Sequence, residues 1–215
     1  MCSDVLLTEI DDLHREEHWH LSPDDRCFHV REYISHGGWH AGETNNLISN
    51  LKKGLDQRGK PGWRFKAKAI QQAGAELRGA ISRRWLNGAA IVPMPPSKAK
   101  THPEYDDRVL QIAKIICMST NAAVRELLIQ TRSMTAFHST EEKRKIQALA
   151  NAWEIDEDLA EPEPEKIGII DDVITTGAHF VAAKRVLGER FPDAQIVGFF
   201  VARRTFAKEG EADAD

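Results

Sequence analysis

The sequence has few of the features that mark secreted or membrane-spanning chains. Its three cysteines, Cys2, Cys27 and Cys117, are odd in number and far apart, so they do not suggest a disulfide framework. No stretch approaches the roughly 18 apolar residues of a transmembrane helix. The first residues also lack an apolar core of signal-peptide length. These absences predict a reduced, cytoplasmic protein with no membrane partner.

A large excess of charge is also missing. The formal net charge is -4, which argues against non-specific nucleic-acid binding through bulk charge but leaves room for a local basic patch. Hydrophobic residues make up 41% of the chain and charged residues 29%, which predicts a packed soluble core. The 215 residues are enough for one large domain, or for one domain with an appendage.

From residue 46 onward the hydrophobic pattern predicts alternating helices and strands. Amphipathic or helix-forming stretches cover residues 46–55, 64–85, 104–118, 140–152 and 177–191, and buried strands are expected at 89–93, 167–171 and 194–203. Residues 123–130 fit a strand or a helix, 131–140 resemble a loop, and 157–166 form an acidic, proline-broken linker. The alternation implies an α/β fold, a Rossmann-like parallel sheet flanked by helices, over residues 46–206. An acidic, frayed tail is expected at 207–215.

Residues 1–45 differ in composition and hold six of the nine histidines. The bulky residues of 27–34 favour a strand. The pairs His18/His20 and Cys27/His29 suggest zinc, but a spacing of one residue is not that of a standard zinc ribbon or finger. We therefore expect this segment to form a small hood over a binding site. Trp39 or Tyr33 would stack on a base there, although an aromatic residue in a small hood more often belongs to the core.

The most informative stretch is IGIIDDVITTGAH, residues 167–179. An apolar strand reaches two adjacent carboxylates, Asp171 and Asp172, and then a loop with Thr175, Thr176 and Gly177 that leads into a helix. Backbone N–H groups, hydroxyls and the positive end of a helix dipole suit a phosphate. The carboxylates suit sugar hydroxyls or a water-bridged magnesium ion. The combination predicts a phosphorylated ribose. The alternatives are a strand that ends in an ordinary helix cap, and a receiver domain, whose acids follow the first strand without such a loop.

This stretch resembles the phosphoribosyl pyrophosphate (PRPP) motif of type I phosphoribosyltransferases. The wider layout of VPMPPSKAK, an arginine-containing helix, TRSMTAFHSTEEKRK, an acidic linker and a closing FFVARR is similar to that of competence protein ComF and its relatives. The likeness covers roughly residues 45–206, and the PRPP motif is its specific part. It implies a core sheet with a mobile loop over the site, and Mg²⁺ as cofactor.

The resemblance also implies roles for single residues. Asp171 and Asp172 would contact the ribose 2- and 3-hydroxyls, take part in catalysis and hold the metal. The 5-phosphate would lie in the loop Thr175, Thr176, Gly177, Ala178 and His179. Ser97 and Lys98 would fall in the pyrophosphate loop, with Lys98 catalytic. Lys100 and Arg108 are further basic residues near the leaving group, although cations on a surface loop are as often simply solvated.

The chain departs from the family in three places. His179 stands where Thr or Ser is usual. Only Arg108 remains of the Arg-Gly-Phe-Asn pattern, and the N-terminal zinc ribbon of ComF relatives has no equivalent. In purine salvage enzymes an Asp serves as base where Thr175 lies here, which argues against 6-oxopurine acceptors.

Two functions follow from the resemblance. The first is a PRPP-dependent transferase with an unidentified acceptor. The second is a non-catalytic PRPP or nucleotide sensor in DNA uptake, DNA processing or a related system, for which a nucleic-acid or protein partner is expected. A homodimer is compatible with either function.

Overall fold

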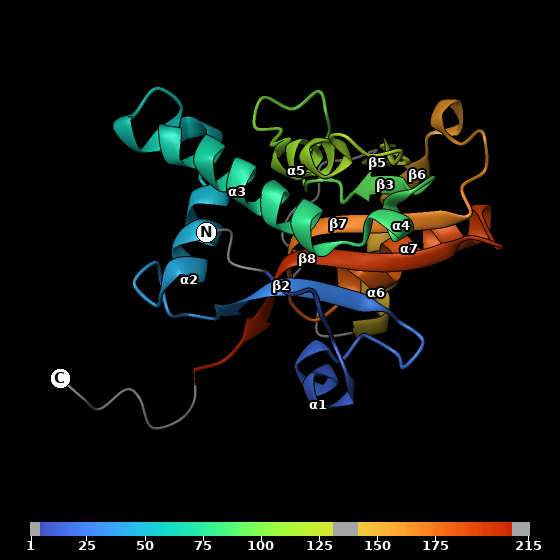
Figure 1. Ribbon diagram of the computed structural model, residues 1–215, viewed down its shortest axis with the longest axis horizontal. Coiled ribbons are helices and arrows are strands. Elements are labelled where there is room, and N and C mark those ends of the chain that lie inside the picture. Colours follow the sequence, from blue (N-terminus) through green and yellow to red (C-terminus); the bar gives the residue numbers. More distant parts are fainter. Residues whose placement is uncertain (1–4, 131–141, 208–215) are drawn as a thin grey trace.

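The centre of the molecule is a six-stranded sheet (Figure 1). The computed structural model describes residues 5–130 and 142–207. The strand order of the sheet is β1-β2-β8-β7-β3-β4. All neighbouring strands are parallel except β1 and β2, which are antiparallel. The strands are β1 (Thr8–Glu9), β2 (Cys27–Ile34), β3 (Ala90–Pro93), β4 (Ala123–Val124), β7 (Lys166–Ile174) and β8 (Gln195–Thr205), with β5 (Leu128–Gln130) and β6 (Trp153–Ile155) in a separate antiparallel pair. The expected α/β fold with a mostly parallel sheet is confirmed.

Helices cover both faces of this sheet (Figure 1). The α-helices are α1 (Asp12–Arg15), α2 (Glu43–Leu51), α3 (Arg64–Ala80), α4 (Arg83–Leu86), α5 (Arg108–Cys117), α6 (Glu142–Ala150) and α7 (Ala178–Arg190), and short 3-10 turns cover Glu16–His18, Leu55–Gln57, Pro61–Trp63 and Glu157–Leu159. Buried residues of α2, α3 and α5 share one core with one sheet face, and those of α6 and α7 share a second core with the other face.

The pairing of α3 with α5 follows from the sequence of α3. Ile70, Ala73 and Leu77 recur at spacings of three and four, so they form one buried stripe. Gly74 lies beside them, and a Cβ there would come within 2.7 Å of the Ile115 side chain. The absence of a side chain at Gly74 therefore lets α5 pack closely on α3.

Three expected elements differ in extent. The single helix expected over 64–85 is interrupted, because Ile81 adopts an extended backbone (ψ 129°) after Gly79, a poor helix former. The strand expected to end at Asp171 continues to Ile174, since the β-branched residues Val173 and Ile174 pair with β8. The ambiguous stretch 123–130 forms β4 and β5. The loop expected at 131–140 and the tail from residue 208 lie outside the described residues.

The N-terminal segment contributes to the sheet. β2 pairs in parallel with β8 over its whole length, from Cys27 beside Gly198 to Ile34 beside Thr205. The expected strand at 27–34 is therefore confirmed, but it is not part of an appendage that ends at residue 45. The residue types that favour a strand also allow β2 to pair with β8, so this segment lies within the sheet, between β1 and β8.

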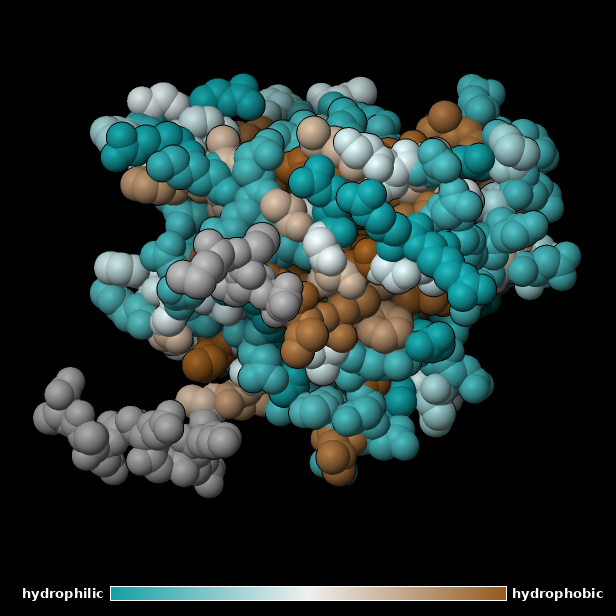
Figure 2. Space-filling view, viewed as in Figure 1, coloured by the Kyte–Doolittle hydropathy of each residue, from teal (hydrophilic) through white to brown (hydrophobic). Residues whose placement is uncertain are grey.

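The visible surface of the protein is mainly polar. Figure 2 shows hydrophilic residues over most of one face, with a hydrophobic area near its middle. Among the described helices, none has the length and apolar character needed to cross a membrane. Cys27 is buried and burial raises the pKa of its thiol, and neither Cys27 nor Cys117 is in a disulfide.

A buried histidine on β2 is expected to make the stability of the fold depend on pH. His29 is 5% exposed, and its Nδ1 lies 3.0 Å from the Arg31 carbonyl, which can only accept a hydrogen bond. Burial lowers the pKa of His29 from 6.5 to about 4. A lowered pKa means that the unfolded chain takes up this proton first as the pH falls. Stability that is complete above pH 6.5 should then be lost between about pH 6.5 and 4.

We expect His29 alone to reduce the free energy of unfolding by about 3 kcal/mol between pH 7 and pH 4. Denaturant unfolding of the wild type and of His29→Asn at several pH values measures this. The stability difference between the two proteins should shrink by that amount as the pH falls, because the variant cannot titrate. Parallel pH profiles would show that His29 is not held neutral by the fold.

Candidate functional site

The two adjacent carboxylates lie in β7, near its carboxyl end, and have different surroundings. Asp172 is 4% exposed and faces α2 and α5. Its Oδ2 accepts a hydrogen bond from Arg108 Nε at 2.9 Å and lies 2.8 Å from Arg108 Nη2 in the same ion pair. Its Oδ1 lies 3.6 Å from Lys52 Nζ. Asp171 is only partly buried, and its Oδ1 accepts the N–H of Asp172 at 2.7 Å. Asp172 thus has two cationic partners, whereas the hydrogen bond described for Asp171 is with the N–H of the next residue.

The pKa values of the pair are displaced in opposite directions. Burial and the negative charge of Asp172 raise the pKa of Asp171. Burial acts in the same direction on Asp172, but Arg108 and Lys52 outweigh it and lower its pKa. Such a divided pair, in which one acid stays ionised and the other holds its proton more tightly, is typical of functional sites and also of structural ion-pair networks.

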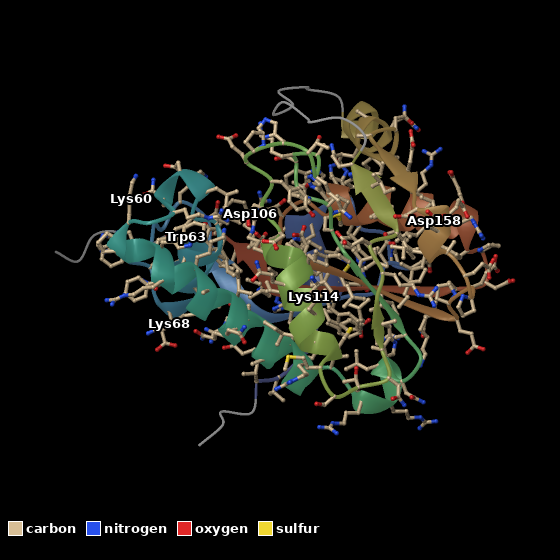
Figure 3. The ribbon with its side chains drawn as sticks, turned by 90° about the horizontal axis from the view of Figure 1, so that it is seen from above. Lys60, Trp63, Lys68, Asp106, Lys114 and Asp158 are labelled. Carbon is tan, nitrogen blue, oxygen red and sulfur yellow. The ribbon has the colours of Figure 1, made fainter. Side chains whose placement is uncertain are left out.

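Arg108 connects Asp172 to a second buried ion pair. Its Nη1 lies 2.8 Å from Asp106 Oδ2, and that oxygen also lies 2.7 Å from Lys66 Nζ. Lys66 is 4% exposed and donates further hydrogen bonds to the carbonyls of Leu51 (2.7 Å) and Lys53 (2.9 Å). Figure 3 shows Asp106 where α5 begins, close to the end of the molecule that carries Trp63. The network ties α2, α3, α5 and β7 together directly behind the Asp171–Asp172 pair.

The loop after β7 has the geometry of an anion site. Gly177 precedes α7 with φ +86°, a left-handed conformation that glycine adopts without strain. The N–H groups of Thr176 and Gly177 have no hydrogen-bond partner in the described chain. They lie at the positive end of the dipole of the 13-residue helix α7. Thr175 is exposed and Thr176 half-buried, whereas Gly177 is buried, so a ligand would approach the loop from the side of the two threonines.

The N-terminal segment lies against this loop. The His20 N–H donates to the Thr176 carbonyl at 3.0 Å, and the His18 ring hydrogen-bonds to the Thr175 carbonyl. A Cβ on Gly177 would meet the Leu21 side chain at 2.8 Å. Residues 18–21 thus cover one side of the loop, as a hood would, although β2 itself belongs to the sheet.

The two other residues expected to contact the phosphate, Ala178 and His179, differ in exposure. Ala178 is buried in the core as the first residue of α7. His179, the second residue, is exposed, and its ring centroid lies 6.3 Å from that of Trp153. The side chain of His179 is therefore placed next to β6, and its contact with a phosphate stays a prediction.

The residues expected in the pyrophosphate loop follow β3 at the same edge of the sheet. The Met94 N–H donates to the Ile170 carbonyl at 2.8 Å, which places the start of this loop beside the residue before Asp171. Ser97 is exposed, and Lys98 and Lys100 lie near carboxylates, at 3.9 Å from Glu104 and 3.1 Å from Glu126. Arg108 lies apart from these lysines, with Asp172 and Asp106.

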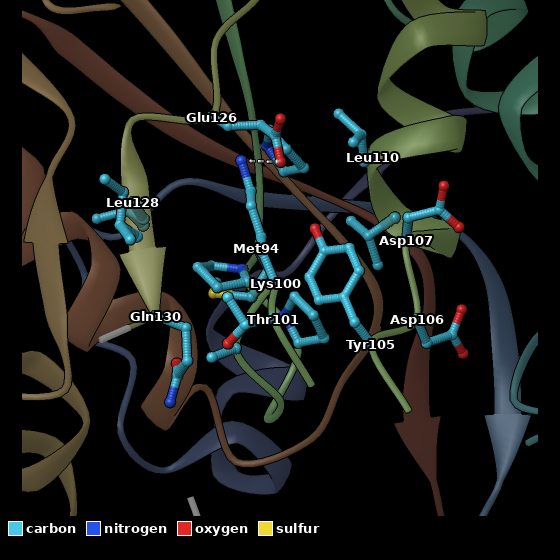
Figure 4. A pocket seen from close by; sticks show the side chains of 16 residues that line it. Met94, Lys100, Thr101, Tyr105, Asp106, Asp107, Leu110, Glu126, Leu128 and Gln130 are labelled. Carbon is cyan, nitrogen blue, oxygen red and sulfur yellow. Dashed lines mark ion pairs between the residues drawn. The ribbon is translucent and has the colours of Figure 1, made fainter. Parts of the chain in front are cut away.

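A cavity of about 290 Å³ opens between this loop, α5 and β5 (Figure 4). Its walls include Met94, Tyr105, Leu110 and Leu128, and the Lys100–Glu126 ion pair lies at one side. Asp106 also lines it, so the cavity adjoins the network behind Asp172. Its mainly apolar walls suit a flat, weakly polar group.

Within residues 5–130 and 142–207, no three or more His, Cys, Asp or Glu side chains gather as a metal site. The Asp171–Asp172 pair offers two carboxylates, and Asp172 is engaged by Arg108 and Lys52. These acids fit a magnesium ion only where substrate phosphates and water complete its coordination, which is the usual arrangement for Mg²⁺.

Sequence reasoning missed several residues that shape the site. His18, Leu21, Lys52, Lys66 and Asp106 all contact it or its supporting network. His18 and Thr175 are 157 positions apart in the chain, so no local spacing signals their contact. A buried lysine is an unusual feature, but burial is not visible in the sequence around Lys66.

Comparison of the chain with models of known protein families, and with curated proteins, found no match in either case.

Proposed function

We propose that the protein binds a ribose 5-phosphate compound and transfers its phosphoribosyl group from PRPP to an acceptor, on a type I phosphoribosyltransferase fold. The observation that supports this most is the Thr175–Gly177 loop before α7. There the N–H groups of Thr176 and of the left-handed Gly177 have no hydrogen-bond partner among the residues that the structure describes. A sugar phosphate bound there would have its ribose close to Asp171, which precedes Thr175 by four residues and lies at the same edge of the sheet.

The two acids take different parts in this proposal. Asp171 accepts hydrogen bonds from ribose hydroxyls, because Asp172 is already engaged by Arg108 and Lys52. Asp172 fixes the orientation of β7 and keeps a negative charge beside Asp171. This charge is one reason why the pKa of Asp171 is raised.

Magnesium enters with the substrate in this proposal. Asp171 would hold it, directly or through water, while the charge of Asp172 lies nearby and pyrophosphate oxygens and water complete its coordination. The ion would neutralise charge that develops on the leaving pyrophosphate.

The protein's contribution to the reaction is positioning and electrostatics. The C1–O bond of PRPP breaks, the bonding electron pair leaves with pyrophosphate, and the acceptor forms the new bond to C1. Lys98 and Lys100 would exchange their contacts with Glu104 and Glu126 for pyrophosphate oxygens. Ser97 lies in the same loop and would donate its hydroxyl.

A non-catalytic PRPP or nucleotide sensor is the second candidate, and one observation favours it. Lys98 and Lys100 both lie near acids, and Arg108 is held by Asp172 and Asp106. The cations that would stabilise a leaving group thus each lie beside a carboxylate, whereas the N–H groups of Thr176 and Gly177 have no partner in the described part of the chain. In this case a protein or nucleic-acid partner would respond to the bound nucleotide.

Release of pyrophosphate from PRPP and Mg²⁺, measured across a panel of bases and amines, separates the two candidates. Acceptor-dependent release that Lys98→Met reduces would support the transferase. Binding of PRPP without release, for every acceptor tested, would favour the sensor. Absence of both would contradict the proposed function.

Replacing Asp171 with Asn should weaken PRPP binding at least tenfold, because hydrogen bonds to a charged acceptor contribute about 1.5–3 kcal/mol. The fold should be retained, since Asp171 has no ion pair in the described chain and its charge repels Asp172. The measurement is calorimetric titration at pH 8, with the exposed Asp193→Asn as the matched control. An unchanged affinity in Asp171→Asn would exclude this acid as a ribose contact.

A further inference from the structure

Three consecutive residues of the Thr175–Gly177 loop are held from one side by residues 18–21, which we call the N-terminal strap. The Thr175 carbonyl meets the His18 ring, the Thr176 carbonyl accepts the His20 N–H at 3.0 Å, and Gly177 lies against Leu21. The strap reaches the loop from a part of the chain more than 150 residues away.

The two carbonyl contacts determine where the loop N–H groups point. In a trans peptide the C=O and the following N–H lie on opposite sides of the chain. With the carbonyls of Thr175 and Thr176 turned to the strap, the N–H groups of Thr176 and Gly177 point away from it. These are the N–H groups without partners in the described chain. The strap thus keeps two donors directed to the open side of the loop.

His18 has one tautomer that fits this contact. The Thr175 carbonyl only accepts, so Nδ1 carries the proton and donates, and Nε2 of the neutral ring is an acceptor. His18 is fully buried, and Nε2 has no hydrogen-bond partner in the described residues. Burial lowers the pKa of His18; the hydrogen bond to Thr175 and the charge of Glu17 oppose this, and Arg203 and Arg204 add to it. A neutral ring with its proton on Nδ1 is therefore maintained in the folded chain.

We propose that His18 is a positioning residue for the anion site: through its Nδ1–H it fixes the Thr175–Thr176 peptide so that the loop donors are set for a phosphate before the ligand arrives. The inference rests on the proposed function for the identity of the ligand. It adds that phosphate affinity depends on a side chain from the N-terminal segment that does not touch the ligand. A loop ordered in advance binds more tightly because less conformational freedom is lost on binding.

Two amide variants test the donor position. The side-chain NH₂ of Asn occupies about the place of His Nδ1, and that of Gln about the place of Nε2. His18→Asn should keep the contact with Thr175 and retain an affinity for ribose 5-phosphate close to that of the wild type. His18→Gln should lose the contact and bind about tenfold more weakly. Calorimetric titration with ribose 5-phosphate measures both, at a temperature where denaturant unfolding shows each variant to be folded.

His29→Asn is the matched control. His29 is also buried, and its Nδ1 also lies against a backbone carbonyl, but that carbonyl belongs to Arg31 on β2 and not to the loop. Its ribose 5-phosphate affinity at pH 7.5 should equal that of the wild type. A merely structural role for His18 would weaken binding in both His18 variants alike, or in neither, and either outcome overturns the proposal. If the wild type binds neither ribose 5-phosphate nor PRPP, the proposed function itself fails, which is a separate result.

Discussion

Replacing Arg108 with Met is expected to destabilise the fold by about 3–5 kcal/mol, because one partner of a buried ion pair would be removed and the other left behind. Asp172 is 4% exposed, and its Oδ2 accepts a hydrogen bond from Arg108 Nε and lies 2.8 Å from Arg108 Nη2. Lys52, at 3.6 Å from Oδ1, is too distant and too exposed to replace these contacts. Unfolding by guanidinium chloride at pH 7.5 measures the loss.

The double variant Arg108→Met with Asp172→Asn provides the control. It removes both charges, so its destabilisation should be smaller than that of Arg108→Met alone, and the double-mutant cycle should show strong coupling. If Arg108→Met reduces the free energy of unfolding by less than about 1 kcal/mol, the Arg108–Asp172 pair contributes no more than an ordinary surface salt bridge.

Replacing Gly177 with Val should abolish stabilisation by PRPP. A saturating ligand at about 100 times its dissociation constant stabilises the folded state by roughly 2.7 kcal/mol. The valine side chain would meet Leu21, since a Cβ at Gly177 lies 2.8 Å and 2.9 Å from its side-chain atoms. It would also disfavour the backbone at φ +86°, and so displace the N–H groups that we assign to the phosphate.

Gly88→Val controls for backbone strain in this experiment. Gly88 also has positive φ, +73°, but a Cβ there would meet no atom within 4 Å, and it lies before β3 at the opposite end of that strand from the site. Both variants should be less stable than the wild type, and only Gly88→Val should still be stabilised by PRPP. Equal stabilisation of the two variants by PRPP would show that the Thr175–Gly177 loop does not bind the phosphate.

Most of the parallel sheet could be predicted from the sequence, because strands are signalled by local apolar runs. The apolar runs that form β3, β7 and β8 are bounded by turns, and a parallel arrangement follows from the helices between them. The strand at 27–34 was also predicted, but its place beside β8 was not. Strand partners are set by contacts between distant residues, which a single sequence does not display.

The same limit applies to the site. The adjacent acids and the glycine that precedes α7 were proposed as site residues from their spacing, because loop and helix chemistry is local. The different surroundings of Asp171 and Asp172 could not be predicted in this way, because they depend on Arg108 from α5 and on Lys52 at the end of α2. Arg108 was expected near a leaving group, and its contacts are instead with Asp172 and Asp106. The contact of His18 with Thr175 likewise depends on the folded chain.

The most direct test of the central claim is calorimetric titration of the wild-type protein with ribose 5-phosphate and with PRPP in the presence of Mg²⁺. Ribose and inorganic phosphate serve as comparisons. Both phosphorylated sugars should bind, and ribose should not, because the loop of Thr175–Gly177 supplies the anion contacts. Ribose 5-phosphate should bind more tightly than inorganic phosphate, because Asp171 adds contacts to the sugar. Failure of both phosphorylated sugars to bind would contradict the assignment of the loop as a ribose 5-phosphate site.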